Sequence, residues 1–187
     1  RESLHFITQI MRGLSHAHSR GIIHRDIKPA NIFFDDFGNF KLGDFGIAKE
    51  LEKTTGAASS KGTFSFMAPE VAHGQRYDNT VDIYSLGLVM YTLLNGNRAP
   101  FIPRDGRVTY NDRKNANDRR LAGEPLPKIV GVSDELNNII LTACSYDPAK
   151  RFKSASAFKN ALKSYKNAPK PTPAPTPFVP EQNIDET

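Results

Sequence analysis

The chain has 187 residues, of which 39% are hydrophobic, so it can form one domain with a substantial core but hardly two. Its 25 Lys and Arg against 20 Asp and Glu give a net charge of +5, too small and too mixed in sign to indicate a nucleic-acid partner. The single cysteine, Cys144, excludes an intrachain disulfide, and five histidines without CxxC or HExxH spacing give no zinc framework. We therefore expect a reducing compartment.

The first part of the chain predicts a helix followed by a hairpin. Apolar residues at spacings of three and four indicate an amphipathic helix over residues 4–18. Two short runs of strand-forming residues follow at 32–34 and 40–42, separated by Asp, Gly and Asn residues typical of a turn. Residues 52–63 have almost no large apolar side chain and predict an exposed loop.

Three further helices are predicted downstream. Residues 81–94 are apolar nearly all the way round, which predicts a helix at the centre of the core, with Thr80 as its N-cap. Two more helices with the 3.6-residue period begin after Ser133 and Ser154, each a suitable cap. The fold class is therefore mainly α with a small β-hairpin.

The ends of this domain follow from composition. The domain covers residues 1–167, and residues 168–187 contain six prolines among small residues, which predicts a Pro-rich disordered tail or linker. No apolar run approaches the roughly 18 residues that a membrane span requires. The basic stretch 104–120 has a single aromatic residue, Tyr110, so we interpret it as a solvated helix face and expect no nucleic-acid binding.

Polar motifs surround the predicted hairpin. Asp26 and Asn31 lie in the loop that precedes it, and Asp44 lies in the turn that follows it. These side chains can therefore converge at one end of the sheet. Hard oxygen ligands of this kind suit Mg²⁺, which is typically held by one or two carboxylates together with substrate phosphates. The pattern suggests phosphoryl transfer.

The order of these motifs resembles a known family. His-Arg-Asp-Ile-Lys-Pro-Ala-Asn at 24–31, Asp-Phe-Gly at 44–46 and Ala-Pro-Glu at 68–70 are similar to the catalytic loop, metal loop and activation-segment end of protein kinases. Over about residues 1–166 the chain resembles eukaryotic-like serine/threonine protein kinases. Tyr84 and residues 101–127 look most similar to bacterial members.

The resemblance implies only part of the kinase-like fold. The sequence begins at the helix that opens the C-terminal, larger lobe of a kinase. It contains no Gly-rich GxGxxG loop, no strand lysine and no partner glutamate, which the N-terminal lobe supplies in the family. We expect the C-terminal lobe with the N-terminal lobe missing, and exposed apolar surface around Phe33 and Phe34.

The resemblance also implies catalytic roles. Asp26 matches the catalytic base, and Lys28 and Thr63 match residues characteristic of serine/threonine specificity. Asn31 and Asp44 match the two positions that hold Mg²⁺ for ATP. Phe33 falls where the family places an aliphatic floor under the adenine; it can serve as that floor or simply as core.

Further positions match regulatory and structural roles. Arg25 and Lys49 resemble the basic pair that grips an activation-loop phosphate. The candidate phosphorylation sites in that loop are Ser59, Ser60, Thr54 and Thr55. The structural set comprises His24, Phe45, Gly46, Glu70, Asp82 and Arg151. Within it, Glu70 and Arg151 match an ion pair, and Asp82 matches a buried residue that holds the catalytic loop.

The functional expectation is a serine/threonine protein kinase fragment that transfers the γ-phosphate of ATP to Ser/Thr hydroxyls of a protein substrate. Alone, without the N-terminal lobe, it should be nearly inactive. The alternative is a truncated, non-catalytic binding or regulatory module derived from a kinase. We expect a cytoplasmic location. The Pro-rich tail is either a spacer towards a membrane anchor or sensor domain, or a disordered end.

Overall fold

The computed structural model describes residues 2–45 and 63–168. This part of the chain is mostly helical with one two-stranded antiparallel sheet, as predicted. Its elements are α1 (Glu2–His18), β1 (Ile32–Phe34), β2 (Phe40–Leu42), α3 (Pro69–Ala72), α4 (Thr80–Leu94), α5 (Tyr110–Leu121), α6 (Asp134–Ala143) and α7 (Ala155–Asn167), with short 3₁₀ turns at Pro29–Asn31, Thr63–Phe66 and Pro148–Lys150. None of the described helices is long and apolar enough to cross a membrane.

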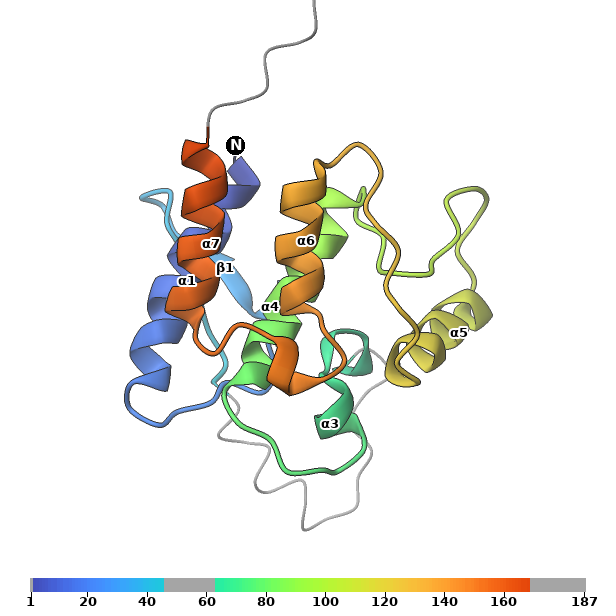
Figure 1. Cartoon of the computed structure of the whole chain (residues 1–187), viewed down its shortest axis with the longest axis horizontal. Helices are drawn as coiled ribbons and strands as arrows, with labels where there is room; N and C mark the ends of the chain where they lie inside the picture. Colours follow the sequence, from blue (N-terminus) through green and yellow to red (C-terminus); the bar gives the residue numbers. More distant parts are fainter. Residues whose placement is uncertain (1, 46–62, 169–187) are drawn as a thin grey trace, which may run out of the picture.

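Helix α4 forms the centre of the core. Every residue from Thr80 to Tyr91 is buried, which explains why its sequence is apolar on all sides. Figure 1 shows α4 in the middle of the molecule, where it contacts α1 and α6. A Cβ at Gly87 would lie 2.8 Å from the Cys144 sulfur and 2.9 Å from the Ala143 Cβ, so glycine permits the close approach of α6.

The hairpin packs on α1 through polar and aromatic contacts. Phe34 of β1 pairs with Phe40 of β2. The Phe40 amide donates to the Gln9 side-chain oxygen at 2.7 Å, and the Phe40 ring meets the Phe6 ring edge-on at 4.8 Å. Helix α1 thereby fixes the edge of the hairpin. On another face α1 packs against α7, where the Ser15 and Ser156 hydroxyls lie 2.9 Å apart.

Two of the three predicted N-caps are confirmed. Ser133 and Ser154 accept hydrogen bonds from the third residues of α6 and α7. The prediction for Thr80 is wrong, because Thr80 is the first helical residue of α4. The Asp78 carboxylate accepts both the Thr80 amide, at 2.9 Å, and the Thr80 hydroxyl, at 2.6 Å. Burial alone would raise the pKa of Asp78, but these bonds lower it below the usual range.

A buried ion pair joins α3 to the turn that precedes α7. Arg151 is 3% exposed and Glu70 4% exposed, and the guanidinium binds both carboxylate oxygens. Its remaining donors bind the main-chain oxygens of Thr80, Ser145 and Tyr146. Both buried charges are therefore fully engaged in hydrogen bonds, which offsets the cost of removing them from water.

Replacing Arg151 by Met should therefore be strongly destabilising. The Glu70 carboxylate would stay buried without its partner, and we expect the free energy of unfolding to fall by about 3–5 kcal/mol in urea titrations. A Glu70→Gln/Arg151→Met double variant should recover part of this loss. The exposed Lys150→Met change is the control, and an Arg151→Met loss no greater than that control would contradict this account.

Candidate active site

The loop between α1 and β1 is held by one buried carboxylate. Asp82, in the first turn of α4, is fully buried and accepts the main-chain amides of His24 and Arg25, each at 2.8 Å. The His18 side chain also lies 2.8 Å from this carboxylate. Arg25 adopts a left-handed backbone conformation with φ 69°, which orients the residue that follows it.

Three polar side chains of this loop are brought together. The Asp26 carboxylate accepts the Lys28 ammonium at 2.8 Å and the Asn31 amide nitrogen at 3.1 Å. The same Asn31 nitrogen donates to the Asp26 main-chain oxygen at 2.8 Å. The Asp26 side chain is 17% exposed and that of Lys28 26% exposed, so both reach the surface from a fixed position.

The residues after β2 are tied to the same loop. The Gly43 amide donates to the Asn31 carbonyl at 3.0 Å, and the His24 ring donates to the Gly43 carbonyl at 2.8 Å. Asp44 follows with φ 52° and an exposed side chain. The Phe45 ring packs on the His24 ring at 4.6 Å between centroids. The backbone that leads to Asp44 is therefore held beside Asn31.

The donor atoms at this site fit a magnesium ion. Because the Asn31 amide nitrogen is engaged with Asp26, its oxygen points in another direction, and Asp44 presents an exposed carboxylate. An amide oxygen and a carboxylate, completed by phosphate oxygens and water, are ligands typical of Mg²⁺. Within residues 2–45 and 63–168, no group of three or more His, Cys, Asp or Glu side chains gathers as a metal cluster.

Phe33 lies beside this site and depends on the glycine that precedes Asp44. The Phe33 side chain is 50% exposed, which argues against a core role. Its ring covers Gly43: an added Cβ there would lie 2.5 and 2.9 Å from two ring carbons, closer than van der Waals contact allows. The Phe33 ring thus occupies the space that a side chain at position 43 would need.

Replacing Gly43 by Ala should displace the Phe33 ring. Because that ring is half exposed and can rotate outwards, we expect a modest loss of about 1–3 kcal/mol in the free energy of unfolding. The Phe33→Ala/Gly43→Ala double variant should lose less than the sum of the two single changes, measured by a double-mutant cycle. Additive losses would show that the two positions do not interact.

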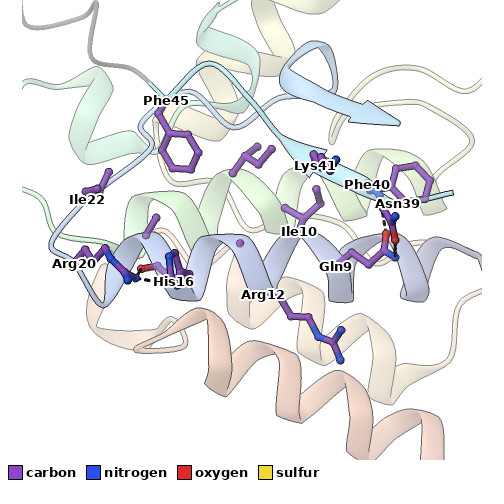
Figure 2. A pocket seen from close by; sticks show the side chains of 13 residues that line it. Gln9, Ile10, Arg12, His16, Arg20, Ile22, Asn39, Phe40, Lys41 and Phe45 are labelled. Atoms are coloured by element: carbon purple, nitrogen blue, oxygen red, sulfur yellow. Dashed lines mark hydrogen bonds between the residues drawn. The ribbon is translucent and has the colours of Figure 1, made fainter. Parts of the chain in front are cut away.

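A groove of about 820 Å³ runs between α1 and β2; Phe45 lines it, whereas Asp26, Asn31 and Asp44 do not. Figure 2 shows Phe45 and Ile22 near one end and Phe40 near the other, with Ile10 on α1 between them. Ile22 is 46% exposed. Phe34 and Phe37 of the neighbouring hairpin are also exposed, so the apolar surface expected around the hairpin is present.

Several predicted site residues lie outside the part of the chain that the structure describes. The Arg25 guanidinium lies over the Tyr77 ring, 5.7 Å from its centroid, but its predicted partner Lys49 lies outside the described residues. The activation-loop prediction therefore stays a prediction. The other positions outside the described part are Gly46, Thr54, Thr55, Ser59 and Ser60, together with the side chain of Thr63.

Sequence reasoning missed three residues of the site. His18 shares the Asp82 carboxylate, Tyr77 lies under Arg25, and Gly43 accommodates Phe33. His18 lies on the helical sequence pattern but carries no signal that distinguishes it from an exposed histidine. A glycine before Asp44 could have suggested a close approach, although not the identity of the neighbouring ring.

Comparison with known proteins agrees with this geometry. A family model described as "Protein kinase domain" matches residues 1–163. The chain belongs to the protein kinase family. The resemblance found in the sequence motifs is thereby confirmed.

The similar proteins include serine/threonine-protein kinases from bacteria and plants. PrkC of Bacillus subtilis is 36% identical over 168 residues, which cover 88% of this chain and 25% of that protein. PknJ of Mycobacterium tuberculosis is 36% identical over 172 residues, covering 85% and 28%. AtPK1/AtPK6 of Arabidopsis thaliana is 34% identical over 161 residues, covering 86% and 32%. The chain thus spans a quarter to a third of the length of these relatives.

Proposed function

We propose that this chain is the C-terminal lobe of a serine/threonine protein kinase that transfers the γ-phosphate of ATP to Ser/Thr hydroxyls of a protein. The observation that carries the proposal is the Asp26 carboxylate, which Lys28 and Asn31 hold beside the backbone that leads to Asp44. Membership of the family, and relatives named serine/threonine-protein kinases, support it.

The proposed roles follow from the chemistry of each group. Asp26, close to the surface, accepts or orients the proton of the attacking hydroxyl. Lys28, bound to the same carboxylate, reaches the transferring phosphate. Asn31 and Asp44 hold Mg²⁺, which neutralises phosphate charge when bound. Thr63 positions Asp26 and Lys28.

Phe33 completes the proposed nucleotide site as the floor under the adenine. Its half-exposed ring offers an apolar surface, and Gly43 leaves room for the ring beside the backbone before Asp44. Apolar contact of this kind suits the face of a purine, since ligand pockets are predominantly apolar with a few polar groups that fix orientation.

The proposed activity requires a second lobe. The sequence holds no GxGxxG loop, and the chain spans only part of its relatives. The groove beside Phe45 and the exposed side chains of Ile22 and Phe34 support a covering segment, because contiguous apolar surface of this kind usually marks an interface. Without that cover, positioning of ATP is lost, and phosphoryl transfer depends on positioning and electrostatics.

The catalytic role of Asp26 is tested by substitution in the protein expressed from its complete gene. Asp26→Asn keeps the size but removes the proton acceptor, so kcat for phosphate transfer to a protein substrate should fall about 10²- to 10⁴-fold. Asp36→Asn, an exposed change in the hairpin turn, is the matched control and should leave kcat unchanged. Equal kcat for Asp26→Asn and the control would overturn the proposal.

Residues 1–187, expressed without a second lobe, should behave as a protein whose apolar groove is exposed to solvent. We expect them to transfer no phosphate from ATP, to bind a fluorescent dye specific for exposed apolar surface, and to unfold over a broad temperature range. The measurements are a radiolabelled ATP assay, dye titration and calorimetry. A sharp, cooperative melt without dye binding would contradict this expectation.

A further inference from the structure

Helix α5 is attached to the rest of the molecule in an unusual way. Of its twelve residues only Ala116 and Arg120 are buried, and the remainder are polar or partly exposed. The helix therefore lacks the apolar stripe by which a surface helix normally packs. Figure 1 shows α5 at the edge of the molecule, away from α7 and α1. Arg120 is the one polar residue of α5 that is buried.

Arg120 reaches from α5 into the core. The side chain is only 3% exposed, and its guanidinium donates to the Met67 carbonyl at 2.7 Å and to the Tyr84 hydroxyl at 3.0 Å. Burial raises the pKa of Tyr84, so this hydroxyl stays neutral and accepts from the guanidinium. Arg120 thus binds one main-chain carbonyl and one residue of the central helix α4.

The Met67 carbonyl belongs to a segment that a second arginine holds from its other end. Met67 precedes Ala-Pro-Glu, and Glu70 is bound by Arg151. The Arg151 guanidinium lies 4.6 Å from the centroid of the Tyr84 ring, the same residue that Arg120 contacts. Arg151 thus fixes the side chain of Glu70, and Arg120 fixes the main-chain carbonyl of Met67, three residues earlier.

We propose that Arg120 is a positioning residue for the protein substrate, acting through the Met67 carbonyl. The inference rests on the proposed function, in which Thr63 contacts Asp26. Residues 63–67 then run from the catalytic aspartate to Arg120, and the described part of this run packs on α4. A shift at Met67 is transmitted over four residues to the place where the protein substrate binds beside Asp26, while the nucleotide contacts at Asn31 and Asp44 are unaffected.

The test uses the protein expressed from its complete gene and separates the Met67 bond of Arg120 from its Tyr84 bond. Arg120→Met removes the guanidinium at similar length, and Tyr84→Phe removes only the Tyr84 hydroxyl. Arg113→Met, an exposed change on the same helix, is the control. For Arg120→Met we expect KM for the protein substrate to rise about tenfold and KM for ATP to change less than about twofold. Tyr84→Phe and Arg113→Met should stay close to wild type.

A lysine variant covers the case in which Arg120→Met does not fold. Lysine retains the charge and one donor for the Met67 carbonyl, so Arg120→Lys should raise KM for the protein substrate about threefold. Arg113→Lys is its control. Equal KM values for these two variants, or parallel rises in KM for protein and ATP, would overturn the proposed role.

Hydrogen exchange separates this inference from the proposed function. In Arg120→Met or Arg120→Lys, the amides of residues 65–72 should exchange about tenfold faster, while those of α1 and the first turns of α4 keep their protection. A wild-type protein that transfers no phosphate would contradict the kinase proposal and the substrate role together. Unchanged exchange at residues 65–72 would overturn the anchoring by Arg120, whether or not phosphate is transferred.

Discussion

The buried carboxylate of Asp82 is the interaction on which the site depends. A charge removed from water is costly unless hydrogen bonds replace its hydration, and here the amides of His24 and Arg25 and the ring of His18 do so. Since Asp82 belongs to the fully buried start of α4, the loop between α1 and β1 is anchored to the core of the protein. The loop is thereby held by the most deeply packed helix of the described structure.

The order created by Asp82 extends, through successive hydrogen bonds, to the residues proposed to hold Mg²⁺. His24, fixed by its main chain, donates from its ring to the Gly43 carbonyl. Gly43 in turn donates to the Asn31 carbonyl, and the Asn31 side chain holds Asp26. Each step is a hydrogen bond between neighbouring segments, so the acidic groups of the proposed site share one frame that begins at the core helix.

Much of the fold could be predicted because local chemistry and tertiary environment agree. The hairpin ends were predicted correctly, since strand-forming residues stop abruptly at the turn 35–39. Helix α4 is apolar on all sides because it is buried on all sides. Thr80 was predicted wrongly as a cap because it is the first residue of the helix, where its own amide and hydroxyl donate to the Asp78 carboxylate.

Only the site residues that belong to a sequence motif were predicted. The polar residues that meet around Asp26 lie within a few positions of one another, so their convergence follows from one loop. The close approach of Phe33 to Gly43 depends on how a ring packs across the hairpin, and the burial of Arg120 depends on a contact between segments distant in the sequence. In a polar, basic helix nothing distinguishes a buried arginine from a solvated one, and the sequence therefore favoured the solvated interpretation.

The central claim is that this lobe works with a second lobe to transfer phosphate. The most direct measurement is to sequence the genomic DNA immediately upstream of the codon for Arg1 and to translate it in frame. The account predicts a Gly-rich loop, a strand lysine and a helix glutamate, which together bind and neutralise the nucleotide. A stop codon followed by a start close to Arg1 would contradict it and would favour a non-catalytic binding module.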